Sequence, residues 1–245
     1  MTLLENKNAL ITGATGGLGI SISKQLAFSG CNLFLTSTNR NQLKNLKKEL
    51  HIINSKIKIN FFECDLSKKS NLISLVKNIN KSFQKIDILI NNAGILPIKL
   101  IEHSTFSDFE KCFNVNLRSP IFLTKEFSKN MKNQKWGRVV NIASSGAYNG
   151  QKKTIIYGST KHALLGFSKA THKELRHFNV RVFCISPGPI KSNMGKTIIP
   201  KLNPDENFST FINPNDIANF IKELISYDSE MFSEEIRLGR IIGEK

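Results

Sequence analysis

The stretch "NALITGATGGLGIS", residues 8–21, joins an apolar run to a turn rich in glycine. The apolar residues of 8–13 follow one another without the alternation of a half-exposed strand, which is typical of a strand covered on both faces. The glycines after it, Gly13, Gly17 and Gly19, have the spacing G-x-x-x-G-x-G. We therefore expect a buried strand, then a tight turn, then a helix that begins at Gly17.

The glycines of this turn leave room where a side chain would not fit. Gly13 permits the tight turn, the missing Cβ of Gly17 lets a diphosphate approach the backbone, and Gly19 lets helix and strand pack closely. The helix N-terminus then offers free N–H groups to phosphate. A glycine-rich turn without a ligand is the alternative, but the position directly after the first strand of an α/β chain favours a nucleotide.

Apolar runs and helical patterns alternate along the whole chain. We expect further strands at 31–37, 58–65, 87–94, 138–144, 180–188 and 235–241, with helices at about 17–29, 40–50, 68–83, 105–131, 154–177 and 214–226. This order predicts an α/β fold over residues 1–245, a single-domain, Rossmann-type, doubly wound parallel sheet between two layers of helices. The segment 189–213 has no clear strand or helix pattern, and we expect a substrate loop there, beyond the carboxyl end of a strand.

Composition limits the classes of function. The 245 residues include 35 Lys and Arg against 19 Asp and Glu, a formal net charge of +16. These basic residues are scattered rather than interleaved with aromatic residues, which favours a solvated surface over a nucleic-acid site. The chain has neither an apolar run of about 18 residues nor a signal-peptide pattern, so we expect a cytoplasmic protein without a membrane span. Its four cysteines lack CxxC spacing, so we expect no metal site.

The end of the second strand indicates which nucleotide fits. A site for NAD(H) commonly has a carboxylate there, which binds the ribose 2′-hydroxyl. Here Ser37 and Thr38 occupy that place, Arg40 and Lys44 follow, and the first acidic residue is Glu49. Hydroxyls and cations suit a 2′-phosphate, so the sequence favours NADP(H) over NAD(H). The alternative for the two basic residues is a solvated helix surface.

The segment "YGSTK" places Tyr157 and Lys161 four residues apart in a helical pattern. Positions i and i+4 share one face of a helix. An ammonium beside a phenol favours the phenolate, so we expect Lys161 to lower the pKa of Tyr157 from about 10 toward neutral pH. Such a tyrosine can give a proton to a carbonyl oxygen. The alternative is an amphipathic helix that carries both residues by chance.

Seven motifs in sequence order resemble those of the short-chain dehydrogenase/reductase family, over residues 7 to about 225. They are TGATGGLG (12–19), CDL (64–66), NNAG (91–94), NVNL (114–117), NIASS (141–145), YGSTK (157–161) and SPGPIKSNM (186–194). Within that family the core is most similar to 3-oxoacyl-acyl-carrier-protein reductases. The C-terminus differs from theirs, because Ser233 and Glu234 replace the usual Thr-Gly and no Gly-Gly tail follows.

The resemblance implies roles for single residues. The implied catalytic residues are Asn116, Ser144, Tyr157 and Lys161. Ser144 would donate to the substrate oxygen and Asn116 would anchor a water in a proton relay, while Asp65 would contact the adenine unless it caps a helix instead. Together with the residues argued above, the implied cofactor contacts are Gly13, Thr15, Gly17, Leu18, Gly19, Ser37, Thr38, Arg40, Asp65, Leu66, Asn92, Ala93, Gly94, Tyr157, Lys161, Pro187, Gly188 and Ile190.

We therefore expect an NADP(H)-dependent enzyme that interconverts a carbonyl and a secondary alcohol by hydride transfer. A 3-oxoacyl thioester is one expected small-molecule substrate, and a sugar or sugar nucleotide is the alternative. A non-catalytic NADP(H) sensor is a third hypothesis, although a sensor would more readily have lost Tyr157 or Lys161. The resemblance also implies a homodimer or homotetramer that associates through helices near 105–131 and 154–177.

Overall fold

One parallel sheet organises the chain, of which the computed structural model describes residues 3–241. The strands lie in the order β3-β2-β1-β4-β5-β6-β7. Chain order reverses between β1 and β4, and the carboxyl ends at such a switch point are where doubly wound sheets bind ligands. The strand bounds are β1 (Asn8–Thr12), β2 (Asn32–Ser37), β3 (Ile59–Glu63), β4 (Ile88–Asn91), β5 (Gly137–Ile142), β6 (Val180–Pro187) and β7 (Glu235–Leu238).

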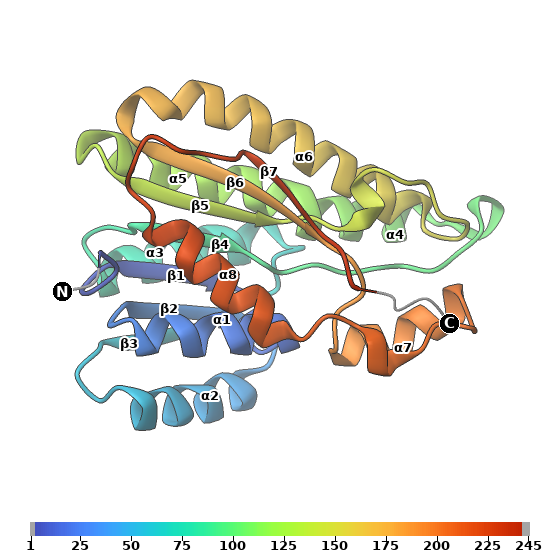
Figure 1. Ribbon diagram of the computed structural model, residues 1–245, viewed down its shortest axis with the longest axis horizontal. Helices are drawn as coiled ribbons and strands as arrows, with labels where there is room; N and C mark the ends of the chain where they lie inside the picture. The colour runs from blue at the N-terminus through green and yellow to red at the C-terminus, as the bar shows by residue number, and fades with distance from the viewer. Residues whose placement is uncertain (1–2, 242–245) are drawn as a thin grey trace.

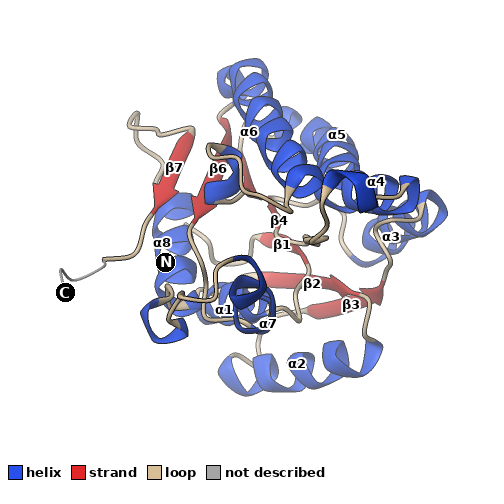
Figure 2. Ribbon diagram, turned by 90° about the vertical axis from the view of Figure 1, so that its right-hand side faces the viewer, coloured by secondary structure: helices blue, strands red, loops and turns tan. Residues whose placement is uncertain are grey.

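Helices cover both faces of the sheet, as Figures 1 and 2 show. One layer contains α1 (Gly17–Phe28), α2 (Arg40–Ile53) and α8 (Pro214–Ser226). The other contains α3 (Lys69–Ser82), α4 (Phe106–Phe113), α5 (Ser119–Asn133) and α6 (Ile155–Leu175). The predicted three-layer, doubly wound fold is confirmed, and the expected strands and helices other than 105–131 have ends within three residues of their predicted positions.

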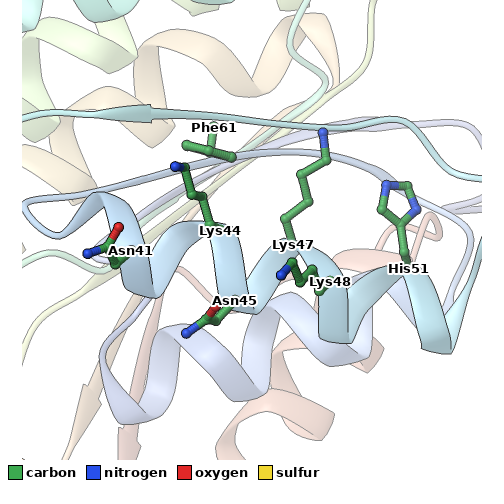
Figure 3. Close-up of a pocket in the computed structure, with 7 residues that line it drawn as sticks. All are labelled: Asn41, Lys44, Asn45, Lys47, Lys48, His51 and Phe61. Carbon is green, nitrogen blue, oxygen red and sulfur yellow. The ribbon is translucent and has the colours of Figure 1, made fainter.

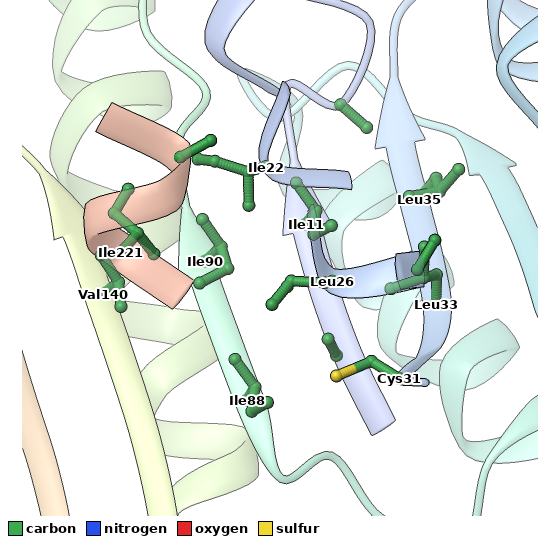
Figure 4. Close-up of a cluster of buried hydrophobic side chains, with 14 of the residues drawn as sticks. Ile11, Ile22, Leu26, Cys31, Leu33, Leu35, Ile88, Ile90, Val140 and Ile221 are labelled. Carbon is green, nitrogen blue, oxygen red and sulfur yellow. The ribbon is translucent and has the colours of Figure 1, made fainter. Parts of the chain in front are cut away.

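Apolar side chains fill the space on each side of the sheet. Successive strand residues point to opposite faces. Ile11 and Leu33 therefore join the cluster that contains residues of α1 and α8, whereas Leu10 and Phe34 join the cluster on the other face. Figure 4 shows the first cluster, where side chains from the strands meet Ile221 of α8. Burial of each such side chain contributes about 1.5–3 kcal/mol, which explains the uninterrupted apolar runs.

The predicted helix over 105–131 is not continuous. α4 ends at Phe113, a π-helical turn spans Asn114–Arg118, and α5 begins at Ser119. The side chain of Asn116 accepts a hydrogen bond from the Ile95 N–H at 2.9 Å and donates one to the Ile95 carbonyl at 2.9 Å. The π-helical turn therefore coincides with a side chain that is bonded to the segment after β4, a pattern frequent at functional sites.

The sequence predicts a loop over 189–213, but part of this segment is helical. It contains helix α7 (Asn193–Leu202) and a 3₁₀ turn at Phe208–Thr210. Ser192 caps α7 by accepting a hydrogen bond from the Gly195 N–H at 3.1 Å. The prediction was wrong because Gly195 and Pro200 both disfavour a helix interior, and here tertiary packing overrides that preference. In Figure 1, α7 lies beyond the edge where the strands end.

The four cysteines form no disulfide, and all four are buried: Cys31, Cys64, Cys112 and Cys184. Burial raises the pKa of Cys31 and of Cys64 to about 12, so both thiols stay protonated. Within residues 3–241, no helix combines the length and the apolar character that a membrane crossing requires.

Candidate active site

A cleft of about 870 Å³ lies at the carboxyl ends of the strands, between the glycine turn, the ends of β2 to β6, and α7. Most of the residues implied by the sequence meet there, although their motifs are spread over the chain. The predicted residues that line the cleft are Gly13, Thr15, Gly17, Leu18, Ser37, Thr38, Asp65, Leu66, Asn92, Ala93, Gly94, Ser144, Tyr157, Lys161, Pro187, Gly188 and Ile190.

The glycine turn has the shape that a diphosphate requires. Gly13 has φ of +62°, and a Cβ on it would lie 2.9 Å from the Ala93 Cα. A Cβ on Gly19 would lie 2.2 Å from the Gly13 oxygen, so Gly19 serves packing behind the cleft. α1 begins at Gly17, and Gly16 at its N-cap brings no side chain to occupy the first N–H groups. The positive end of this helix therefore faces the cleft and fits a phosphate group.

Hydrogen bonds fix the ends of β1 and β4 beneath this turn. Thr12 Oγ1 accepts from the N–H groups of Asn92 and Ala93, both at 3.0 Å. The Asn92 amide donates to the carbonyls of Thr12 and Gly13, also at 3.0 Å. The floor of the cleft at the switch point is thus held by side chains rather than by strand pairing alone.

The far end of the cleft carries polar groups suited to an adenosine. Asp65 Oδ1 accepts from the Ser67 N–H at 3.0 Å and from the Ser67 hydroxyl at 2.7 Å. The hydroxyl hydrogen bond is the main cause that lowers the Asp65 pKa, so the carboxylate is charged at neutral pH. Asp65 therefore both caps the turn after β3 and lines the cleft. Ser37 and Thr38 line it at the end of β2.

Ser37 and Thr38 line the cleft, whereas Arg40 and Lys44 are not among its lining residues. Arg40 is the first residue of α2, and its guanidinium lies over the ring of Phe61, 5.9 Å from the centroid. Lys44 lines a separate basic hollow of about 530 Å³ between α2 and β3, and Figure 3 shows the Phe61 ring next to the Lys44 side chain. Contact of Arg40 with a 2′-phosphate therefore stays a prediction, and Lys44 fits the alternative of a solvated helix surface.

The first turns of α6 place Tyr157 and Lys161 on one face of the helix, as the spacing predicts. Lys161 Nζ lies 5.6 Å from the centroid of the Tyr157 ring and donates to the Ile142 carbonyl at 2.7 Å. Ser144 lies two residues after the end of β5, and its Oγ accepts from the Gly146 N–H at 3.1 Å. A Cβ on Gly146 would lie 3.5 Å from both Ser144 Oγ and the Tyr157 ring, so Gly146 lies between these two hydroxyl-bearing residues.

Burial dominates the protonation of this pair. It raises the pKa of Tyr157 to about 12, against a smaller lowering by the hydrogen bond with Ser144. Burial also lowers the pKa of Lys161 to about 8. The expectation that the Tyr157 pKa falls toward neutral pH is therefore wrong for this arrangement, because burial of the phenol raises the pKa more than its neighbours lower it. At pH 7 Tyr157 is neutral and holds its proton.

Asn116 lies behind the cleft lining, 1% exposed, in the π-helical turn. Besides its two bonds to Ile95, its Nδ2 donates to Thr160 Oγ1 at 3.1 Å. A Cβ on Gly94 would lie 3.7 Å from both Asn116 Oδ1 and Lys161 Nζ, so both groups lie close to Gly94. Asn116 thus sits next to the catalytic candidates with its amide orientation fixed.

Several residues of the site could not be predicted from motifs. Thr160 is fully buried and its hydroxyl donates to the Tyr157 carbonyl at 2.7 Å, while it accepts from Asn116. Its place next to Lys161 in "YGSTK" is the pattern that could have found it. The rest of the cleft lining comes together only by tertiary packing, and it includes Leu96, Lys111, Gln151, Thr154, Met194, Ile199, Leu202, Asn203 and Glu206.

Known proteins resemble this chain along most of its length. A family model described as short chain dehydrogenase matches residues 7–203. A 3-oxoacyl-[acyl-carrier-protein] reductase of Aquifex aeolicus is 33% identical over 233 residues, which cover 91% of this chain and 93% of that protein. The same-named protein of Buchnera aphidicola is 34% identical over 196 residues, covering 80% of this chain and 78% of that protein.

Solved structures share the fold at lower identity. Levodione reductase superposes with a TM-score of 0.87 at 24% identity and 96% coverage of both chains. A metagenomic short-chain oxidoreductase in complex with NADP superposes with a TM-score of 0.83 at 23% identity, covering 98% of this chain and 100% of that one.

Proposed function

Because the chain belongs to the short-chain dehydrogenase family and is an NAD(P)-dependent oxidoreductase, we propose that it reduces a carbonyl to a secondary alcohol with NADPH. The observation that carries the proposal is the arrangement of Ser144, Tyr157 and Lys161 at one end of the cleft. Carbonyl reduction needs a hydride, a proton and donors that hold the carbonyl oxygen. A bound nicotinamide supplies the hydride, and these three residues supply the rest.

Each of the three residues has a distinct task in this proposal. The hydroxyls of Ser144 and Tyr157 hold the carbonyl oxygen, where negative charge develops in the transition state. Tyr157, neutral at pH 7, then gives up its proton to that oxygen. The Lys161 ammonium stabilises the resulting phenolate, since an opposite charge favours the ionised form. Asn116 holds the strand end beside Lys161 and anchors the relay that returns a proton.

NADP(H) rather than NAD(H) is the proposed cofactor. Ser37 and Thr38 line the cleft at the end of β2, where a carboxylate would select against a 2′-phosphate. Hydroxyls donate hydrogen bonds to phosphate oxygens and carry no charge that would repel them. Thermal shift measured with NADPH and with NADH tests this choice, and a larger stabilisation by NADH would reject it.

A 3-oxoacyl thioester is the proposed substrate class. Curated relatives with this activity align over most of the chain, and Leu96, Met194, Ile199 and Leu202 give the substrate side an apolar wall. A sugar or sugar nucleotide is the second candidate, favoured by the polar side chains of Gln151 and Asn203 in the same wall. NADPH consumption with an acetoacetyl thioester, compared with a panel of keto-sugars, separates the two classes.

The same assay separates an enzyme from a sensor. A non-catalytic sensor would bind NADPH without turning over any compound of the panel.

We also propose that the protein associates into a homodimer or homotetramer and that it is located in the cytoplasm. Light scattering of the purified protein tests the assembly.

A further inference from the structure

We propose that Arg240 is a positioning residue that holds the substrate lid over the cleft through an ion pair with Glu206. The substrate lid is the segment 191–211, which contains α7 and the 3₁₀ turn before Phe211. The inference rests on the proposed function for its kinetic consequences, but the ion pair and its effect on the lid are independent of the substrate.

The base of the lid is pinned to the end of β6. Ile190 and Ile212 form a parallel bridge, in which the Ile212 N–H donates to the Pro189 carbonyl at 2.9 Å and the Lys191 N–H donates to the Ile212 carbonyl at 2.9 Å. The segment between these residues leaves the chain that follows β6 and returns to pair with it. Its two ends are therefore fixed, and the position of α7 depends on contacts farther along the lid.

One of these contacts is a two-pronged ion pair with the C-terminal segment. Arg240 Nη2 lies 2.6 Å from Glu206 Oε1, and Arg240 Nη1 lies 2.5 Å from Glu206 Oε2. Nη1 also donates to Thr210 Oγ1 at 3.1 Å, and the guanidinium lies 5.6 Å from the centroid of the Phe211 ring. One side chain thus contacts three residues of the lid, with the planar geometry that makes Arg–carboxylate pairs directional.

The pair is sheltered and anchored to the sheet. The side chains of Arg240 and Glu206 are 16% and 18% exposed, so solvent and salt screen them less than an open surface pair. Arg240 follows β7 closely, and the Leu238 carbonyl accepts from the Gly188 N–H at 2.8 Å. The guanidinium therefore connects the lid to the last strand of the sheet.

The lid presents part of the substrate wall. Ile199, Leu202 and Asn203 line the cleft together with Glu206. Both Glu206 oxygens are bonded to Arg240, so the carboxylate is occupied in holding the lid. Loss of the pair should let the lid open, which weakens substrate binding more than it slows the chemical step at Tyr157.

Three variants test the role: Arg240→Gln, Glu206→Gln, and the exchanged pair Glu206→Arg with Arg240→Glu. The matched control is Lys24→Gln, which removes the cation of the more exposed Lys24–Glu49 pair on the outside of the fold. Each protein is measured by steady-state kinetics on the carbonyl substrate, by NADPH affinity, and by hydrogen exchange of peptides from 193–211.

We expect each single variant to raise KM for the carbonyl about fivefold to tenfold, with kcat and NADPH affinity changed less than about twofold. Amides of α7 should exchange faster in both single variants but not in the control. The exchanged pair should restore both KM and exchange toward the wild-type values. The exchange readout applies even if the carbonyl assay finds no substrate, so it separates this inference from the proposed function.

Two results would overturn the role. Unchanged exchange of the lid in Arg240→Gln would show that the ion pair does not position α7. An exchanged pair whose KM stays as high as that of Glu206→Gln, with exchange restored, would show that Glu206 acts on the substrate directly.

Discussion

A single buried hydroxyl connects two of the candidate catalytic residues. Thr160 Oγ1 accepts from Asn116 and donates to the carbonyl of Tyr157. It lies one residue before Lys161, so it ties the π-helical turn to the face of α6 that carries the tyrosine and the lysine. The positions of these side chains are therefore coupled through one atom.

Thr160→Val removes that hydroxyl at nearly constant volume and leaves the Asn116 amide with the Ile95 carbonyl and the weakly accepting Cys112 Sγ, 3.3 Å away. We expect kcat to fall about tenfold while NADPH affinity stays unchanged, because sulfur is a weak acceptor and a poorly satisfied buried amide, which costs up to about 1–3 kcal/mol, relaxes the local geometry. Steady-state kinetics and NADPH titration check this. Thr160→Ser, which keeps the hydroxyl, should restore activity, and equal loss in the serine variant would argue against the hydrogen bond.

Lys161 should cost stability at neutral pH. Its pKa in the folded protein is lowered from 10.5 to about 8 by burial. Between these values the unfolded chain binds more protons than the folded one, so stability rises with pH across that window. Lys161→Met should be more stable than the wild type by about 1 kcal/mol or more at pH 7, with a gap that narrows toward pH 10. Urea unfolding measures both proteins, and a gap independent of pH would contradict the assignment.

At the scale of elements, the sequence predicts the strands and helices that depend on a local pattern of residue types. The apolar runs and the glycine turn predicted the strands and α1, because two-sided burial and tight turns demand particular residue types. The break at Asn116 was missed because it coincides with side-chain hydrogen bonds to Ile95, 21 residues earlier in the chain, which no local helix pattern reveals. α7 was missed because Gly195 and Pro200 read as helix breakers, whereas Gly195 packs against Ile190.

Some residues of the candidate site can likewise be predicted from local patterns, and others cannot. Residues that follow strands, such as Asp65 and Ser144, could be predicted because parallel strands end at one edge of the sheet. Glu206 and Arg240 could not, since only tertiary packing brings them together. The protonation of Tyr157 was also mispredicted, because spacing says nothing about the burial that raises its pKa.

One buried cation joins β5 to the end of α8. Arg138 is fully buried, donates to the carbonyls of Ile225 and Tyr227 at 3.3 Å, and pairs with Asp228 at 2.5 Å. Its guanidinium thus satisfies carbonyls that the helix terminus leaves without partners. The arrangement fixes α8 against the sheet.

Asp228→Ala leaves this buried cation without its carboxylate. We expect a loss of about 1–3 kcal/mol in the free energy of unfolding, less than for a fully buried pair because Asp228 is 36% exposed. Urea unfolding measures it. Glu223→Gln, on the exposed partner of Lys222, is the control and should change stability by less than about 0.5 kcal/mol. Equal effects of both variants would refute the role of Arg138.

At the scale of the whole molecule, the charge of +16 has a kinetic consequence. A positive field attracts an anionic dinucleotide, and salt screens that field. We expect kcat/KM for NADPH to fall several-fold between about 0.05 M and about 0.5 M ionic strength, and less steeply for NADH, which lacks the 2′-phosphate. Initial rates across a salt series measure both slopes, and equal slopes would argue against 2′-phosphate recognition.

We propose that Tyr157 donates the proton in NADPH-dependent carbonyl reduction. The most direct test is Tyr157→Phe, assayed for NADPH consumption and for NADPH binding by thermal shift on the same preparation. We expect turnover to be abolished while NADPH still stabilises the protein, because the phenyl ring fills the same space without a proton to give. Near wild-type turnover by the variant would contradict it.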